Sequence, residues 1–272
     1  MNHNSEKQKE FVNRRIQPNL KVSKVGIVSR DYRYEFNGHA DFSSNLEKLL
    51  NILDREGCDV ILFSLFSFRT RQGFSIKKYF ANLINIKLVI FETFQFDERN
   101  IYKPIGNYAY HKDHKINKWN EYKYQQKFGS LSEISNEDIG NFVKDELPLR
   151  IFGNSILLIC GETNGVKYTK AFKKIEDIYR LRKAIPADVK IILNPIHDRM
   201  TRFEMKLKRI YLSQNKRWVI SVWNKGKEDK SRKVRDGVNP AWSVYHNGIE
   251  VKIKPIESDL NYEIGIIDTI DR

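Results

Sequence analysis

Cysteine is scarce in this sequence, and its apolar runs are short. Cys58 and Cys160 are the only cysteines among 272 residues, and no Cys-x-x-Cys or His/Cys cluster has the spacing of a metal site. Glycine patterns that cradle phosphates are absent as well. We therefore expect no metal or other cofactor, and a reducing, cytoplasmic setting. No apolar run approaches the length that a bilayer requires, so no membrane association is expected.

Acidic residues are outnumbered by basic ones. The chain has 48 Lys and Arg against 34 Asp and Glu, which gives a formal net charge of +14. Such a charge attracts polyanions, and aromatic residues interleave with the basic ones between 102 and 124. Nucleic acid is therefore one partner that the composition allows.

Apolar patterning predicts alternating strands and helices. Helices are expected over 43–57, 75–85, 170–185 and 202–216. Strands are expected over 24–31, 58–68, 86–96, 107–119, 155–162, 188–198, 217–226, 241–255 and 261–270. Residues 116–150 carry no clear pattern. The order predicts an α/β domain that closes in antiparallel strands, with a polar leader at 1–22 and one domain at 23–272.

Cys160 stands where an apolar strand runs into a Gly-Glu turn, in "SILLICGE". A catalytic thiol needs access at a strand end, help in losing its proton and donors for an oxyanion. Gly161 would let substrate and backbone approach closely. A cysteine after an apolar run also fits a plain core position. Both interpretations stay open on this segment alone.

Several segments, taken in order, resemble the nitrilase superfamily of carbon–nitrogen hydrolases. They are "KVGIVSRD", "NLEKLLNILDREGCDVILF", "YHKDHK", "ILLICGE", "ILNPIHD", "RIYLSQNKRWVISVWNKG" and "AWSVYHNG". The resemblance implies a four-layer α-β-β-α sandwich of mixed sheets that pairs into homodimers. It implies that Cys160 attacks an amide or nitrile carbon, with Lys112 and the backbone N–H after the cysteine stabilising the oxyanion.

The second strand departs from the family pattern. The family has Phe-Pro-Glu there, with the glutamate as general base, whereas this chain has Phe63-Ser64-Leu65. Leucine cannot accept a proton. Glu121, Glu162, His111 and His114 are candidates to replace the glutamate as general base. Glu92, in a later strand, is a further candidate.

Three functions remain open at this stage. The first is an amidase-type hydrolase with a rearranged base. The second is a catalytically inactive nitrilase-like module that binds a small molecule or a partner protein. The third is a basic accessory protein that contacts nucleic acid through 170–183 and through 224–237, which belongs to a predicted charged loop at 224–240.

Overall fold

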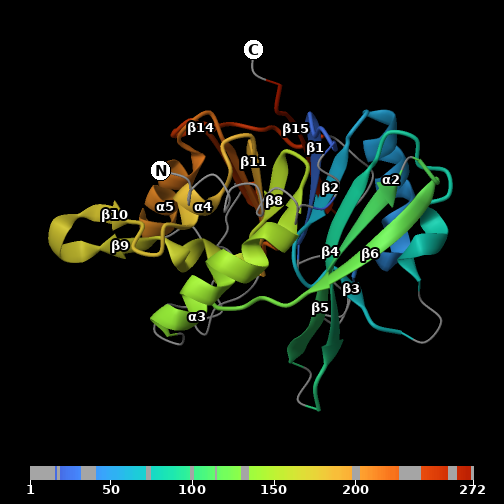
Figure 1. Ribbon diagram of the computed structural model, residues 1–272. Helices are drawn as coiled ribbons and strands as arrows, with labels where there is room; N and C mark the ends of the chain where they lie inside the picture. Colours follow the sequence, from blue (N-terminus) through green and yellow to red (C-terminus); the bar gives the residue numbers. More distant parts are fainter. Residues whose placement is uncertain are drawn as a thin grey trace.

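The computed structural model describes two mixed β-sheets packed face to face (Figure 1). The residues described are 16, 19–31, 41–71, 75–98, 101–113, 115–129, 135–197, 203–226, 240–256 and 262–270. The predicted charged loop at 224–240 lies mostly outside these ranges.

The first sheet has the strand order β15-β1-β2-β4-β5-β6, with β3 paired to β4. Strands β1, β2 and β4 are parallel, whereas β15, β5 and β6 run antiparallel to their neighbours. The bounds are β1 Lys24–Arg30, β2 Val60–Phe63, β3 Phe68–Arg69, β4 Leu88–Phe96, β5 Tyr102–Asp113, β6 Lys118–Tyr124 and β15 Tyr262–Asp268.

The second sheet has the order β14-β13-β12-β11-β8-β7, and its three central strands β12, β11 and β8 are parallel. The bounds are β7 Ile151–Phe152, β8 Ser155–Leu157, β11 Ile191–Pro195, β12 Trp218–Val222, β13 Trp242–His246 and β14 Ile249–Val251. β13 and β14 form the predicted hairpin, and Asn247 and Gly248 both have positive φ at its turn, as a tight hairpin requires.

The core lies in three layers of side chains. One apolar cluster fills the space between the sheets and draws on β1, β2 and β4 from one side and on β8, β11 and β12 from the other. A second cluster packs α2 (Leu46–Arg55) against the outer face of the first sheet. A third packs α3 (Asn136–Asn141) and α5 (Phe203–Ser213) against the outer face of the second. The predicted four-layer α-β-β-α sandwich is thereby confirmed.

Two predicted helices are wrong. Residues 75–85 form only a 3-10 turn at Ile76–Tyr79. Residues 170–185 contain the end of a hairpin arm, β9 (Lys167–Thr169) with β10 (Lys174–Glu176), and one short helical turn, α4 (Leu181–Ala184). The arm projects from the body at the left of Figure 1. Lys173 and Arg180 adopt left-handed backbone, which interrupts a continuous helix.

The patternless stretch 116–150 contains real structure. β5 continues into β6 as a long hairpin that ends the first sheet, and α3 follows with a side-chain cap from Ser135. A π-helical segment (Phe142–Glu146) and a 3-10 turn (Leu147–Arg150) then lead into β7.

The described part of the predicted leader contacts the core. Leu20 and Val22 belong to the cluster between the sheets, and Ile16 pairs with Phe152. Among the described residues, no helix has the length and apolarity needed to cross a membrane.

Candidate active site

Cys160 begins a six-residue 3-10 turn, Cys160–Gly165, that follows β8 at the carboxyl end of the parallel strands. Its backbone has φ +45°, a left-handed conformation that costs free energy in a residue with a Cβ. The side chain is half-buried, beside Ile196, Trp223 and Ala241. The thiol therefore projects from a strained turn at a strand end, which is a geometry found at nucleophiles.

Asn194 fixes the strand end before this turn. Its Nδ2 donates to the carbonyl oxygens of Leu158, at 2.6 Å, and Cys160, at 3.2 Å. Its Oδ1 accepts a hydrogen bond from Ser221 on β12. Because Asn194 is fully buried, these bonds are shielded from water and hold three neighbouring segments in register.

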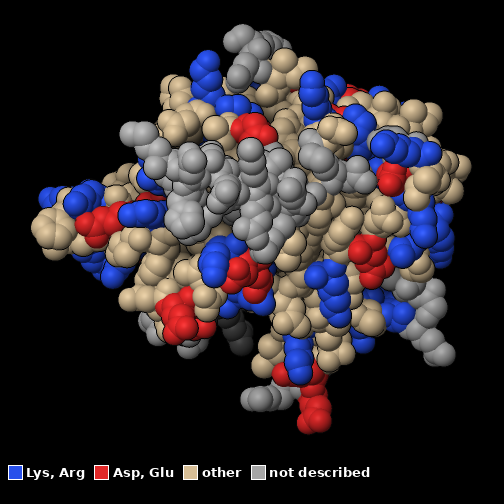
Figure 2. All heavy atoms as spheres, in the orientation of Figure 1, with Lys and Arg blue, Asp and Glu red and all other residues tan. Residues whose placement is uncertain are grey.

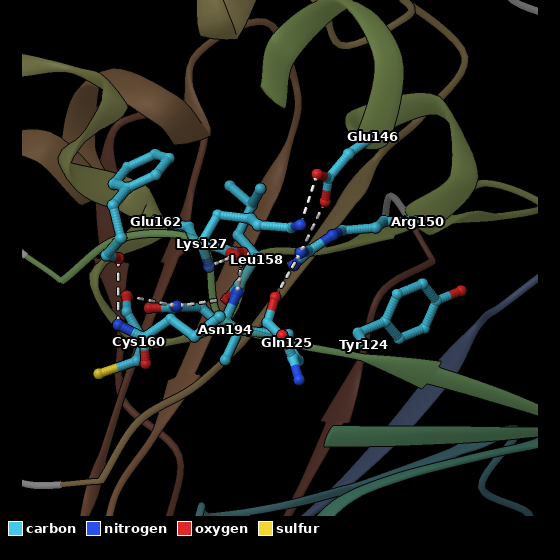
Figure 3. Close-up of polar contacts among 12 residues, drawn as sticks. Tyr124, Gln125, Lys127, Glu146, Arg150, Leu158, Cys160, Glu162 and Asn194 are labelled. Atoms are coloured by element: carbon cyan, nitrogen blue, oxygen red, sulfur yellow. Dashed lines mark hydrogen bonds and ion pairs between the residues drawn. The ribbon is translucent and has the colours of Figure 1, made fainter. Parts of the chain in front are cut away.

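A buried ion pair fixes the turn from its other side (Figure 3). Oε2 of Glu162 accepts hydrogen bonds from Nη1 of Arg150, at 2.6 Å, and from the N–H of Ile159, at 2.7 Å. Its Oε1 accepts from the N–H of Lys127. Burial is the main effect on Glu162 and raises the pKa of its carboxyl, although Arg150 opposes the shift. Glu162 thus joins three segments and has no free face for a substrate.

Gly161 lets the loop after β6 approach the cysteine turn. A Cβ on Gly161 would lie 2.2 Å from the carbonyl oxygen of Gly129, closer than any side chain tolerates. The glycine is required by this backbone contact. The same loop carries Lys127, whose Nζ lies 2.7 Å from Glu146.

A histidine and a glutamate complete the surroundings of Cys160. His197 follows β11, and its Nε2 lies 2.8 Å from Oε2 of Glu92. The side chain of Cys160 is near enough to His197 to affect the pKa of the imidazole. Glu92 lies on β4 of the other sheet and faces inward, on the same side of the strand as Ile90. Cysteine, histidine and carboxylate therefore form a chain of contacts across the space between the sheets.

Phe66 closes one side of this chain of contacts. Its N–H donates to Oε2 of Glu92 at 2.8 Å, and its ring centroid lies 4.2 Å from that of His197. Phe66 also has a left-handed backbone, with φ +54°. Glu92 is 1% exposed, and its Oε1 has no hydrogen-bond partner among the described residues.

The contacts of His197 favour its charged form. Burial acts to lower the pKa of the imidazole, but the hydrogen bonds to Cys160 and Glu92 and the charges of both groups raise it, to about 10.

The position where the family pattern has a glutamate is part of the apolar core. Leu65 is fully buried in the cluster between the sheets. Its carbonyl accepts from Nδ2 of Asn224, and its N–H donates to the carbonyl of Ile196, the residue before His197.

Lys112 and Glu121 lie elsewhere. Along β5, Ala109 faces the space between the sheets, whereas Tyr110 and therefore Lys112 face the outer layer. Nζ of Lys112 donates to the carbonyl of Leu83 there, at 2.7 Å. Glu121 accepts from the hydroxyl of Tyr110 and pairs with Lys77 on that outer face. The structure does not bring either residue to Cys160.

His111, another candidate base, lies at the opposite end of the strands from Glu92. His111 pairs with Leu88 at the start of β4, whereas Glu92 is four residues further, about 13 Å along the strand. His111 is buried at that far end, and His114 lies outside the described residues.

Aromatic residues that interleave with basic ones between 102 and 124 in the sequence pack on other aromatic rings. Tyr122 and Tyr124 pack on Phe152, and Tyr108 stacks on Phe91.

On the face shown in Figure 2, basic and acidic side chains are interspersed. Within the described ranges, no three His, Cys, Asp or Glu side chains gather as metal ligands would.

His197, Arg150 and Asn194 are not among the site residues predicted from the sequence. Glu92 is predicted there only as a possible replacement base in a later strand. Two signals are present in the sequence: a glutamate that interrupts the apolar run "VIFETF", and a histidine two residues after a buried strand that ends in Asn-Pro. Neither showed that the two would meet.

No protein-family model matches the chain, and no curated protein matches it. Solved structures of an amidase from Nesterenkonia sp. AN1 do match. One shares 14% identity, with 90% of this chain and 92% of that chain covered and a TM-score of 0.45. A cysteine-to-alanine variant, described as an amidase of the nitrilase superfamily, shares 12%, with 92% of each chain covered and a TM-score of 0.46. The four-layer α-β-β-α fold itself rests on the two sheets of this chain and on its three core clusters.

Proposed function

We propose that the protein hydrolyses a carbon–nitrogen bond of an amide through Cys160, with His197 as acid and base and Glu92 as the group that orients the imidazole. The contact chain from Cys160 through His197 to Glu92 carries this proposal. His197 can accept a proton. Leu65, which stands where the family pattern has its general base, cannot.

In the first half of the reaction, Sγ of Cys160 attacks the amide carbonyl carbon. The carbonyl π electrons move onto oxygen, and the backbone N–H of Gly161 is the proposed donor to that oxyanion. The tetrahedral intermediate collapses with cleavage of the C–N bond. The proton on His197 passes to the departing amine, which leaves a thioester on Cys160 and a neutral imidazole.

In the second half, neutral His197 removes a proton from water as the water oxygen attacks the thioester. Collapse of this intermediate cleaves the C–S bond, releases a carboxylic acid and restores the thiolate beside the imidazolium. Glu92 keeps one ring nitrogen of His197 bound throughout, so the ring holds one orientation in both steps.

The proposal is tested by the rate at which iodoacetamide alkylates Cys160, followed by intact mass between pH 5 and 9. We expect the wild type to react at pH 6, and His197→Ala to react at least tenfold more slowly there. His246→Ala is the matched control, because His246 stacks on Trp218 at the far end of the second sheet. Cys58 is an internal reference, since burial is the main effect that raises the pKa of its thiol to about 12.

Turnover is then measured on a panel of small amides by ammonia release. Activity that disappears in Cys160→Ala and His197→Ala supports the hydrolase. Equal alkylation rates in wild type and His197→Ala would overturn the assigned role of His197. A reactive thiol with saturable amide binding but no ammonia would instead identify an inactive binding module.

A further inference from the structure

Helix α5 buries two cationic side chains. Lys208 is 7% exposed and Arg209 is 2% exposed, on the same helix face as Met205 and Leu212. Lysine and arginine are rarely buried without partners, because removing a charge from water is costly. The sequence and its amphipathic pattern give no structural reason for cations on this face.

Lys208 ties α5 to the cysteine turn. Its Nζ donates to Oδ1 of Asn164, at 2.6 Å, and Asn164 lies in the turn that Cys160 begins. Nδ2 of the same asparagine donates to the carbonyl of Gly129. The buried face of α5 is therefore held against the candidate active site.

Arg209 has no such partner within the described residues. Its Nε and Nη2 are buried and make no hydrogen bond there, and its guanidinium carbon lies 5.7 Å from the centre of the Trp223 ring. Tyr245 and Glu250 act to raise the pKa of Arg209, but the carboxylate of Glu250 lies within 3.5 Å of Lys206 and Lys252. Burial lowers the pKa of Arg209 to about 10, so the side chain stays charged at neutral pH.

Trp223 lies against the guanidinium of Arg209 and belongs to the apolar cluster around Cys160. Trp223 and Cys160 pack in one small apolar cluster with Ile196 and Ala241. The ring that faces the guanidinium of Arg209 thus belongs to the cluster against which Cys160 packs. A planar guanidinium binds a carboxylate through two parallel hydrogen bonds, which would satisfy its buried donors.

We propose that Arg209 is a specificity residue that binds an anionic carboxylate at the far end of a short substrate, so that the preferred substrates are monoamides of small dicarboxylic acids. This rests on the proposed hydrolase function for the reaction itself. The binding of the anion is a separate property and can be measured without catalysis.

The binding experiment uses full-length Cys160→Ala protein, with succinate, glutarate and inorganic phosphate as probes in calorimetry. We expect a dicarboxylate to bind and Arg209→Met to weaken it at least tenfold. Lys206→Met is the matched control, because Lys206 is an exposed cation on the same helix. Removing an unpaired buried charge should also raise the Tm of ligand-free Arg209→Met, which a purely structural arginine would not do.

The kinetic experiment compares succinamate with butyramide, a neutral amide of equal chain length. We expect kcat/KM to favour succinamate at least tenfold, and this preference to disappear in Arg209→Met but not in Lys206→Met. Equal turnover of both amides by wild type would overturn the specificity proposal and leave the hydrolase proposal intact. Dicarboxylate binding without turnover of any amide would support Arg209 and refute the hydrolase. Arg209-dependent binding of phosphate but of neither dicarboxylate would overturn the assignment of a carboxylate.

Discussion

The N–H of Leu65 donates to the carbonyl oxygen of Ile196, at 3.2 Å. This bond joins the segment after β2 to the segment after β11, one residue before His197. Phe66, next along the chain, donates its N–H to Glu92. The segment after β2 therefore supplies no proton acceptor at Leu65, but its backbone N–H groups bond to Glu92 and to the residue before His197.

Glu92→Gln should flatten the pH dependence of stability. The pKa of folded His197, about 10, is above its ordinary value of 6.5. The resulting stabilisation is complete below about pH 6.5 and is lost as pH rises through about 10. We expect the free energy of unfolding of wild type, measured in urea at pH 6, 8 and 10, to exceed that of Glu92→Gln most at pH 6. Parallel profiles for the two proteins would contradict this.

Leu65→Glu should destabilise the protein and not restore a base. The side chain is fully buried among apolar neighbours, so an introduced carboxylate has no water and no described cation beside it. We expect a loss of about 3–5 kcal/mol in the free energy of unfolding, measured by urea denaturation. Leu65→Met is the control and should cost less than about 1.5 kcal/mol. A stable Leu65→Glu protein that hydrolyses amides faster would refute this account of the site.

Arg150→Met should cost about 3–5 kcal/mol, because it leaves the buried carboxylate of Glu162 without its cation. The double variant Arg150→Met/Glu162→Leu should be less destabilised than the sum of the single variants, because no lone charge remains. The exposed pair Lys252–Glu250 is the control, and breaking it should change stability by at most about 1 kcal/mol. Additive effects at Arg150 and Glu162 would show that the pair is not coupled.

Gly161→Ala should disturb the site itself. Its Cβ would collide with the backbone of Gly129, so the cysteine turn or the loop after β6 must move. We expect at least a tenfold slower alkylation of Cys160 and a lower Tm. Gly140→Ala is the matched control, because nothing lies within 4 Å of that Cβ and alanine favours the helix by about 0.5–1 kcal/mol. Unchanged alkylation in Gly161→Ala would show that the turn tolerates displacement.

The strands and two helices could be predicted because their apolar residues follow one spacing over many positions. β1, β4, β11 and β12 each contain a short run of apolar residues, and α2 has leucines at helical intervals. The segment 170–185 failed because Ile175, Ile178 and Leu181 also fit helical spacing. The left-handed backbone at Lys173 and Arg180 interrupts that helix, and the apolar spacing does not reveal it.

The site was predictable only where its chemistry is local. Cys160 could be singled out because strand, cysteine and glycine are consecutive. His197 and Glu92 are 105 positions apart and belong to different sheets, so only the packing of one sheet on the other brings them together. Lys112 was assigned by a short motif, and the alternation of side chains along β5 directs it to the outer layer.

Glu92 belongs to the first sheet, whereas Cys160 and His197 follow strands of the second. The reactivity of the Cys160 thiol should therefore depend on the relative position of the two sheets. A small sliding of one sheet over the other would separate His197 from Glu92 while every strand kept its own hydrogen bonds. In mild denaturant, thiol reactivity at low pH should therefore disappear before the far-ultraviolet circular dichroism signal changes.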